Sequence, residues 1–474
     1  MDIKKIRFIE PGNLPYRKSF RNLYTYEKYI RTPSHGILTL TTIVKEQVDD
    51  TLMYSESISK VVWDDVLDAD IVFLGIFTFA AIRGYELARY IKEHSNALVV
   101  MGGLHASMSC EETAQHCDYV LLGEAEESIL ELITALRNDV LIDFPGVAYM
   151  SDNGGFIHTG DRKPPESFDT IPDRNLLYRY HKMAGHNTIW PQVQASRGCP
   201  HDCDYCAVVR HFGHRLRTRS TESILQDIRQ AIAFHDDRAL PRLMKLLWIT
   251  DDNFFADRNW AMSVLRAIIA SDIDYNFTIQ ARYDVGLDDE MLDLLKAAGF
   301  MEIAMGIEFI EDESFDIYNK SSSTADIVRA IKNIQAKGMN VRGLFIVGAE
   351  NHTPGIGYRL AEFVLKYDIR GVLIQSMYFI PGTPVYEENK DRLLHQDWSK
   401  YCGHVVHNPA RMTAHQLQRE IIQASGKIYS LKNTIRAILT RRWREKLLFL
   451  GERFWQRSVC RDLRHELPNL PGAE

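Results

Sequence analysis

Along this chain, apolar runs of strand length alternate with segments whose apolar residues recur at helical spacing. The first expected strands are nearly continuously apolar, as in strands that are buried on both faces of a parallel sheet. They cover residues 6–9, 52–54, 70–76, 97–101 and 119–122. Helices are expected over about 83–93 and 126–136. Strand–helix alternation at this spacing predicts a parallel α/β sheet with helices on both faces.

A second strand–helix series follows a stretch rich in Gly, Asp and Pro that lacks periodicity. Its six expected strands cover 189–195, 245–249, 277–280, 303–305, 341–347 and 372–376. Six parallel strands joined by helices are typical of a partial (β/α) barrel, in which the chemistry lies at the carboxyl-terminal rim. After Trp398 the alternation stops and helical patterns continue.

These patterns predict an α/β protein with four regions. We expect a Rossmann-like (flavodoxin-like) parallel sheet over 1–150 and a linker over 151–188. A partial (β/α)6 barrel over 189–395 and a C-terminal helical region over 396–474 complete the chain.

Composition narrows the class of protein. The net charge of −7 argues against a general nucleic-acid binder. Of the seven cysteines, three belong to one motif and four are scattered, which suits a reducing compartment and not a disulfide framework. The first residues lack the apolar core of a signal peptide, and the longest uncharged apolar run, 71–82, is too short to span a bilayer. We therefore expect a cytoplasmic protein.

Three cysteines, Cys199, Cys203 and Cys206, lie in a loop that follows the first strand of the second series. The Cys-x-x-x-Cys-x-x-Cys spacing allows them to hold three irons of one iron–sulfur cluster. No fourth cysteine lies nearby, so one iron would keep an open coordination site. The alternative is a structural zinc site, to which His201 could contribute the fourth ligand.

With the aromatic residue Tyr205 just before the last cysteine, this motif resembles the signature of the radical S-adenosylmethionine (SAM) enzymes. Residues 190–385 carry the resemblance. It implies that Cys199, Cys203 and Cys206 hold a catalytic 4Fe–4S cluster whose open iron is chelated by SAM. It further implies reductive cleavage of SAM to a 5′-deoxyadenosyl radical, with an electron donor such as flavodoxin or ferredoxin.

Polar residues follow successive apolar strands of the expected barrel, where they would converge on one rim. These residues are Asp251, Asp252, Gln280, Arg282 and Glu308. Their positions resemble the SAM-contacting strand ends of the family, so we expect them to bind the cofactor together with Tyr205. For each aspartate the alternative is a helix cap, and for Arg282 it is an ion pair with a neighbouring acid.

Several strands of the first sheet end in glycine, at the edge where ligands of such sheets bind. The candidate residues at this edge are Gly75, Gly102, Gly103, His105, Gly123 and Glu124. Residues 3–140 are similar to the cobalamin-binding domain that precedes many radical SAM cores, which implies that these residues contact cobalamin, with His105 as a polar lining residue. A purely structural domain is the alternative.

One departure from the cobalamin pattern affects the metal. Many cobalamin domains carry an Asp-x-His-x-x-Gly loop whose histidine ligates cobalt. The corresponding loop here, residues 10–15, contains no histidine. We expect cobalamin to bind without a histidine ligand from this loop.

The tail is basic, with interleaved aromatic and aliphatic residues such as Trp443 and Phe454. Such helices can lie on an anionic membrane surface, or they can pack on the barrel as a lid over its mouth.

The resemblance predicts a cobalamin-dependent radical SAM methyltransferase that acts on an unactivated carbon of a small-molecule or lipid-like substrate. One alternative is cyclisation, oxidation or rearrangement without methyl transfer. Another is a non-catalytic cobalamin and iron–sulfur sensor, against which the open cluster site and the polar strand ends argue.

Overall fold

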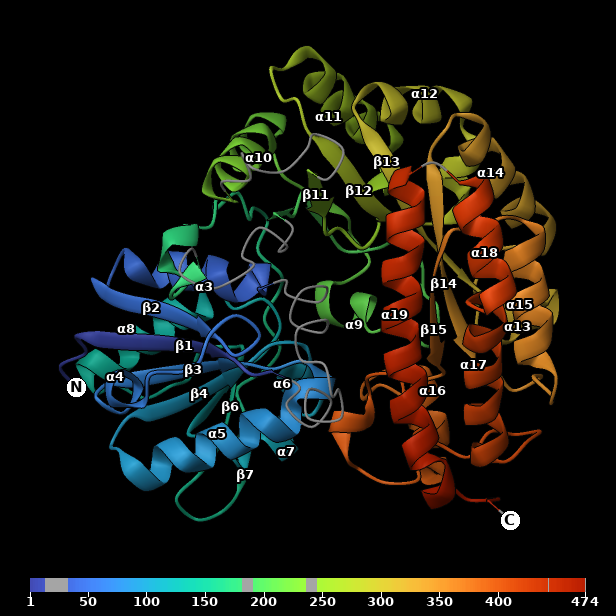
Figure 1. Ribbon diagram of the computed structural model, residues 1–474. Helices are drawn as coiled ribbons and strands as arrows, with labels where there is room; N and C mark the ends of the chain where they lie inside the picture. The colour runs from blue at the N-terminus through green and yellow to red at the C-terminus, as the bar shows by residue number, and fades with distance from the viewer. Residues whose placement is uncertain (13–32, 181–190, 236–244, 442, 474) are drawn as a thin grey trace.

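The computed structural model describes residues 1–12, 33–180, 191–235, 245–441 and 443–473. Two α/β units lie side by side, and a bundle of C-terminal helices packs against the second unit (Figure 1). Both sheets are built mainly from parallel strands, so the predicted fold class is confirmed.

The first sheet has the strand order β2-β1-β3-β4-β5-β6-β7. Its parallel strands are β1 (Lys5–Glu10), β2 (Asp50–Ser55), β3 (Ile71–Gly75), β4 (Leu98–Gly102) and β5 (Tyr119–Leu121). Two antiparallel strands, β6 (Val147–Met150) and β7 (Phe156–His158), extend this sheet. Strand β7 lies inside the range that we interpreted as a linker. That stretch lacks an apolar pattern because β7 is a half-exposed edge strand.

Helices cover both faces of the first sheet because its central strands present apolar side chains on both sides. Helices α3 (His35–Lys45) and α8 (Ser128–Asn138) pack on one face and α5 (Ala81–His94) on the other (Figure 1). Short helices α6 (Leu104–Met108) and α7 (Cys110–Ala114) follow β4. The result is the doubly wound arrangement in which ligands bind at the carboxyl edge.

The second sheet contains six parallel strands in the order β15-β14-β13-β12-β11-β8. They are β8 (Gln192–Val193), β11 (Leu246–Ile249), β12 (Asn276–Ala281), β13 (Phe300–Glu308), β14 (Asn340–Val347) and β15 (Gly371–Ser376). The first two residues of the strand expected over 189–195 lie outside the described residues. Helices α10 (Thr221–His235), α11 (Arg258–Ala270), α12 (Asp289–Ala297), α14 (Thr324–Ala336) and α15 (Ile356–Lys366) connect the strands.

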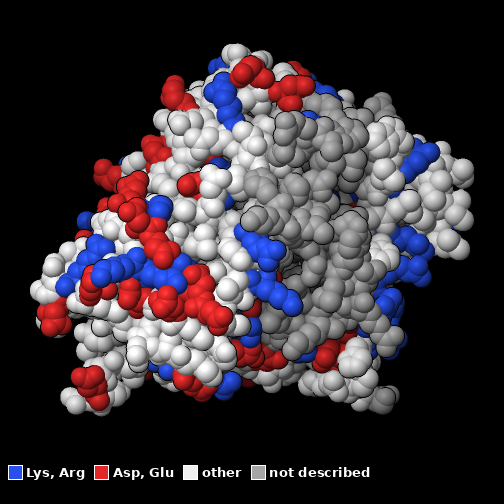
Figure 2. Space-filling model, turned by 60° about the vertical axis from the view of Figure 1, so that its left-hand side comes forward, with Lys and Arg blue, Asp and Glu red and all other residues white. Residues whose placement is uncertain are grey.

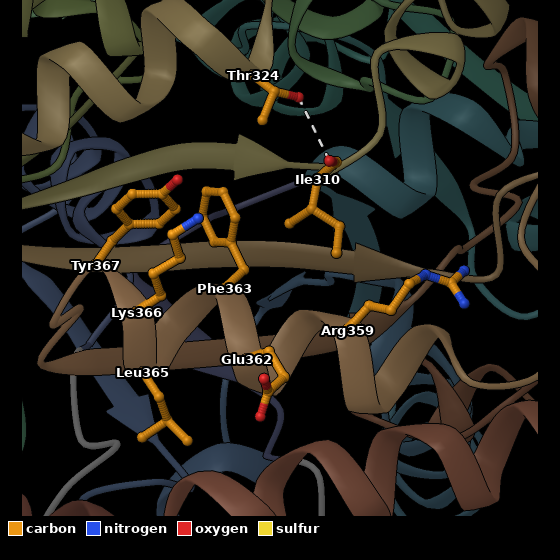
Figure 3. A pocket seen from close by; sticks show the side chains of 8 residues that line it. All are labelled: Ile310, Thr324, Arg359, Glu362, Phe363, Leu365, Lys366 and Tyr367. Carbon is orange, nitrogen blue, oxygen red and sulfur yellow. Dashed lines mark hydrogen bonds between the residues drawn. The ribbon is translucent and has the colours of Figure 1, made fainter.

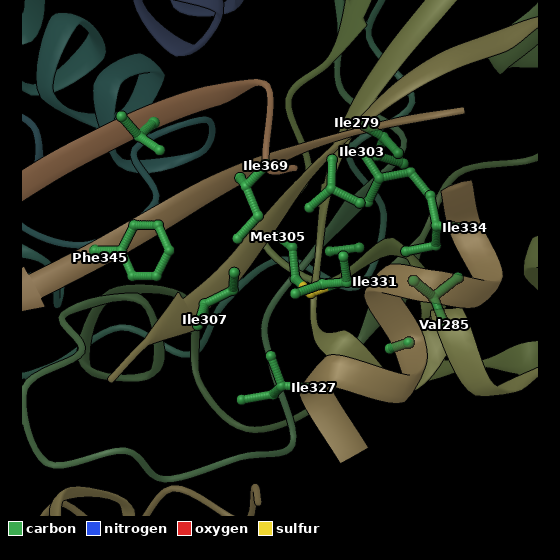
Figure 4. Close-up of a cluster of buried hydrophobic side chains, with 14 of the residues drawn as sticks. Ile279, Val285, Ile303, Met305, Ile307, Ile327, Ile331, Ile334, Phe345 and Ile369 are labelled. Carbon is green, nitrogen blue, oxygen red and sulfur yellow. The ribbon is translucent and has the colours of Figure 1, made fainter. Parts of the chain in front are cut away.

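Alternate residues of the central strands face opposite sides of this sheet. On β13, Ile303, Met305 and Ile307 are fully buried and pack toward α14, where Ile331 and Ile334 meet them (Figure 4). The intervening residues of β13 stay partly accessible on the opposite, inner face. This alternation leaves an inner surface on which strand-end polar residues can meet.

The tail forms α17 (Ala414–Ile428), α18 (Leu431–Thr440) and α19 (Trp443–Glu466). Helix α17 packs on α15 and β15, and α19 packs on α17 (Figure 1). Near the start of α19, Glu445 pairs with Arg370, which precedes β15. The first part of α19 therefore lies toward the amino-terminal ends of the strands and does not form the lid that we considered. No helix among the described residues is long and apolar enough to span a membrane.

Contacts between the two units join the loops that follow their strands. Trp398, in the segment after the barrel, donates from its indole Nε1 to Glu112 on α7 at 2.8 Å. Gly382, after β15, lies so close to Met108 on α6 that a Cβ there would collide with the thioether. The carboxyl edges of the two sheets thus approach one another.

Candidate functional site

The three motif cysteines lie on the loop between β9 (Ser196–Arg197) and α9 (Val208–Phe212). Strand β9 pairs with the antiparallel strand β10 (Arg217–Thr218). Gly198 begins the loop at φ +92°, and a Cβ there would collide with the carbonyl oxygen of Arg215. Only glycine fits this close approach, which sets the direction in which the loop leaves the strand.

The cysteine side chains sit in a partly enclosed environment. Burial raises the pKa of the Cys206 thiol to about 12 and also raises the pKa of Cys203. The Asn253 amide Nδ2 lies 3.5 Å from the Cys199 sulfur. Three thiols on one short loop fit a multi-iron cluster, and binding the metal would release their protons.

The zinc alternative requires four ligands around a single ion. Among the described residues, no three His, Cys, Asp or Glu side chains converge in that way. His201 is half-buried. Its pKa is lowered mainly by burial and, to a smaller extent, by the positive charge of the nearby Arg282.

Asp251, at the carboxyl end of β11, faces the protein interior. Its carboxylate accepts hydrogen bonds from the backbone N–H of Ala195 at 2.7 Å and from the Ser196 hydroxyl at 2.5 Å. Burial raises the pKa of Asp251 to about 7. Both oxygens are engaged by the strand that leads into the cysteine loop, so this side chain supports the loop from behind. Asp251 is not the N-cap of the following helix, because Asp257 caps α11.

Asp252 has a different environment. Its charge raises the pKa of Cys206, which places it beside the cysteine loop. Burial raises the pKa of Asp252 to about 6. In the described part of the chain, its carboxylate has no recorded hydrogen-bond or ion-pair partner. Of the two aspartates, Asp252 is the one with a free carboxylate for an amino group.

Gln280 is the second-last residue of β12, and Arg282 directly follows that strand. Gln280 is partly accessible, as are the inner-face residues of β13. Arg282 donates from Nη2 to the Ser321 carbonyl at 2.8 Å, and its Nε lies 3.4 Å from Asp284. The ion pair that we considered is thus present. The positive charge of the guanidinium also opposes the effect of burial, which raises the pKa of Cys203.

Glu308 ends β13 at a register shift, with a left-handed backbone at φ +64°. Its carboxylate lies 3.4 Å from the Lys320 ammonium, which donates to the Gly306 carbonyl at 2.8 Å. The charge of the same lysine opposes the effect of burial, which raises the pKa of Cys203. Burial and the charge of Glu308 both raise the pKa of Tyr205. Sequence reasoning missed Lys320 because it lies in an irregular segment without a strand-end signal.

Glu124 does not lie open at the edge of the first sheet. It is buried and forms ion pairs with Arg197 at 2.6 Å and with Arg217. Glu126 reaches the same Arg197 at 2.5 Å, and the Phe168 ring lies 4.5 Å from its guanidinium. These contacts join the edge of the first sheet to both strands that flank the cysteine loop. The Glu124 carboxylate is thus engaged by two arginines, and its contact with cobalamin stays a prediction.

The other candidate residues of this edge fall into two groups. Gly75 packs against Ile37, and Gly103, at φ +100°, leaves no room for a Cβ beside the Ile76 carbonyl. These two glycines are required by packing. Gly102 lies in ordinary contact with the next strand, and Gly123, at φ +64°, faces open space. Gly123 is therefore the position at which a ligand could approach the backbone.

His105 does not line an open surface in the described structure. It is fully buried, its Nε2 is 3.1 Å from the Tyr85 hydroxyl, and the Trp398 ring packs against it. Burial lowers the pKa of His105 to about 4, so the ring is neutral near pH 7.

A pocket of about 600 Å³ lies away from these residues, on the outer side of the barrel (Figure 3). It is lined by α15 residues, including Arg359 and Phe363, and by Ile310 and Thr324. None of the candidate residues contributes to it. The candidate residues of the barrel lie instead at the strand ends and on the cysteine loop.

Comparison with known proteins agrees with this geometry. Residues 193–363 match the radical SAM superfamily model. This match begins at β8 and includes the cysteine loop, Asp252 and Glu308. The chain is a radical SAM enzyme with a cobalamin-binding-like N-terminal domain. The family implies a 4Fe–4S cluster and SAM as cofactors, and the three loop cysteines are the residues that would hold the cluster.

Curated relatives extend the similarity over most of the chain. An uncharacterized methyltransferase of Pyrococcus horikoshii is 25% identical over 84% of this chain and 87% of its own length. The bacteriochlorophyllide d C-12(1)-methyltransferase of Chlorobaculum tepidum is 22% identical over 83% and 82%. The hopanoid C-2 methylase of Rhodopseudomonas palustris is 23% identical over 77% and 66%.

Solved structures share the two-domain fold. The radical SAM methyltransferase TsrM from Kitasatospora setae, with cobalamin and a 4Fe–4S cluster bound, has a TM-score of 0.65 and 15% identity, covering 82% of this chain and 78% of that one. The cobalamin-dependent radical enzyme OxsB has a TM-score of 0.72 and 15% identity, covering 97% and 72%. The Rossmann-like sheet and the barrel thus occur together in enzymes of this fold.

Proposed function

We propose that this enzyme is a cobalamin-dependent C-methyltransferase that methylates an unactivated carbon of an apolar, lipid-like substrate. The observation that carries the proposal is the direct ion pairing between Glu124, at the ligand edge of the first sheet, and Arg197, beside the cysteine loop. A cofactor seated at Gly123 would lie on the edge of the first sheet that contacts the strand leading into the cysteine loop.

Two further observations support a methyl-transfer reaction. The relatives that cover most of the chain include methyltransferases of bacteriochlorophyllide d and of hopanoids, which are large and mainly apolar substrates. The structures with this fold include two with cobalamin bound. These relatives favour methyl transfer over a sensor without catalysis, whereas the magnesium-protoporphyrin IX monomethyl ester cyclases, 26% identical over 60% and 65% of this chain, keep cyclisation as the second candidate.

The cofactors would supply the reactive chemistry, namely radical formation from SAM and a transferable methyl group. The residues of this chain would bind the cofactors and orient them. Cys199, Cys203 and Cys206 would hold the cluster, and Asp252 would accept hydrogen bonds from the SAM amino group. Glu308, fixed by Lys320, would accept from the nucleoside. Electrons would come from a small donor such as flavodoxin or ferredoxin.

The proposal is tested by reconstituting the protein anaerobically with iron, sulfide and hydroxocobalamin and removing free cofactor. We expect the optical spectrum to show both the cluster and corrin in equimolar amount. With SAM, a reductant and apolar acceptors such as hopanoids, we expect 5′-deoxyadenosine and a product in which one hydrogen is replaced by a methyl group, a net mass gain of CH2.

Two other outcomes have separate meanings. A cluster and SAM cleavage without retained corrin would refute cobalamin dependence and favour radical chemistry without methyl transfer. A cluster that never cleaves SAM, in the presence of a competent reductant, would refute an enzymatic role and favour the sensor.

A further inference from the structure

The outward faces of α18 and α19 expose an unusual number of large apolar side chains. Nine of them are between 38% and 76% exposed. They are Leu431, Ile435, Ile438, Leu439, Trp443, Leu447, Leu448, Leu450 and Phe454. The two helices pack on each other (Figure 1), so these side chains belong to one region of the surface. Contiguous apolar surface of this kind marks an interaction site.

Helix α19 carries an apolar stripe on the side that faces away from the protein. Trp443, Leu447, Leu450 and Phe454 recur at alternating steps of four and three residues, which places them on one stripe of the helix. The opposite side, which includes Gln456, packs on the protein, where its amide donates to the Val372 carbonyl at 3.1 Å. The apolar stripe therefore points away from the body of the enzyme.

Positive charge continues this stripe. Arg457, Arg461 and Arg464 follow Phe454 on the same side of α19, and Lys432 and Arg436 lie on α18. All five are exposed, and no ion pair is recorded for them within the described residues. Their charges are therefore available to an anionic partner.

The acidic residues of α19 do not neutralise this face, because each contacts a basic side chain in the body of the protein. These inward pairs are Glu445 with Arg370, Glu452 with Arg342, Asp462 with His404 and Glu466 with Lys400. The helix thus turns its negative charges inward and leaves its positive charges outward.

We propose that this α18–α19 surface docks on an anionic lipid bilayer. Apolar side chains flanked by arginines and lysines match the acyl boundary and the acidic headgroups of such a membrane. A second copy of the chain is a poorer occupant, because a symmetric contact would bring like charges together. The start of α19 lies by the amino-terminal ends of β14 and β15, so docking would leave the cysteine loop accessible.

The test is co-flotation of the full, cluster-loaded protein with vesicles. We expect binding to vesicles of equal parts phosphatidylglycerol and phosphatidylcholine, and little binding to phosphatidylcholine alone. The double variant Leu447→Asp/Phe454→Asp should reduce binding at least about tenfold. Reversing Arg457 and Arg461 to Glu should reduce it by about fivefold for each charge and make the remainder less sensitive to salt.

A matched control uses exposed apolar residues elsewhere. Val140→Asp/Leu141→Asp changes two exposed side chains of the N-terminal domain and should bind vesicles like the wild type. Retained cluster absorbance and an unchanged rate of SAM cleavage in all variants would show that they are folded.

Three results would overturn the proposal. They are equal binding to neutral vesicles, unchanged binding of the α19 variants, and self-association in solution that the α19 variants abolish. None of these depends on which substrate is methylated, so the membrane proposal can fail while the proposed reaction stands.

Discussion

Glu124 and Arg197 form a buried ion pair, with 2.6 Å between Oε2 and Nη1, that connects the two halves of the enzyme. Glu124 follows the last parallel strand of the first sheet, and Arg197 stands two residues before Cys199. The same carboxylate also holds Arg217 on the neighbouring strand. One side chain thus fixes both strands that flank the cysteine loop.

We predict that Glu124→Gln destabilises the protein by about 3 kcal/mol, because the buried Arg217 loses its counter-charge and Arg197 keeps only its pair with Glu126. Urea unfolding monitored by circular dichroism measures this loss. Glu127→Gln is the matched control, since Glu127 is exposed and its pair with Arg162 is worth no more than about 1 kcal/mol. Equal losses in the two variants would contradict the structural role of Glu124.

Replacing Cys199 by Ala should remove the cluster and with it all SAM cleavage, because two thiolates on the loop cannot hold three irons. Iron and sulfide analysis together with 5′-deoxyadenosine formation measures the effect. Cys402→Ala serves as the control, since Cys402 is also half-buried but lies outside the motif. Persistent SAM cleavage in the Cys199 variant would show that the cluster is held elsewhere.

Gly198→Ala should lower cluster content severely, because its Cβ would collide with the Arg215 carbonyl in a left-handed backbone. Gly213→Ala provides the comparison. That glycine is also left-handed, at φ +79°, but its Cβ would face open space. We expect it to cost about 1 kcal/mol of stability and to keep its iron. If both variants load iron equally, the close approach at Gly198 does not position the loop.

Gly123→Ala should weaken cobalamin retention with little effect on folding, because its Cβ would enter the open space at the edge of the first sheet. Gly154→Ala is the matched control. Gly154 also has a left-handed backbone with open space around the position of a Cβ, but it lies in the turn between β6 and β7. Corrin retained after desalting is the measurement. Wild-type retention by the Gly123 variant would place the cofactor away from this backbone.

Glu10 should make stability depend on pH. Burial raises its pKa to about 7, and its Oε2 has no hydrogen-bond partner among the described residues. The folded state therefore holds a proton that the unfolded state loses above about pH 4.5, so stability falls as pH rises from about 4.5 to 7 and then levels off. The total loss is about 3 kcal/mol at most.

Glu10→Gln should abolish that dependence. Since glutamine stays neutral, we expect the variant to be more stable than the wild type at pH 8 and similar to it near pH 4.5. Urea midpoints at the two pH values give the comparison, with the exposed Glu93→Gln as control. A variant that is less stable at pH 8 would mean that the Glu10 carboxylate is ionised and paired in the folded protein.

The sequence alone determined the parallel strands of both sheets and the cysteine loop. These features depend on local patterns: apolar runs of strand length, glycine or polar residues at strand ends, and three cysteines in one short segment. The antiparallel strand β7 escaped prediction because a half-exposed edge strand carries no apolar run.

Only the tertiary structure decided what the polar strand-end residues touch. Asp251 and Asp252 are neighbours with the same chemistry, yet one supports the strand behind the loop and the other lies beside Cys206. Glu124 meets arginines far along the chain, and Lys320 reaches Glu308 from an irregular segment. Such contacts depend on how distant segments pack, because successive side chains point in different directions and partners are set by three-dimensional proximity, which local periodicity does not encode.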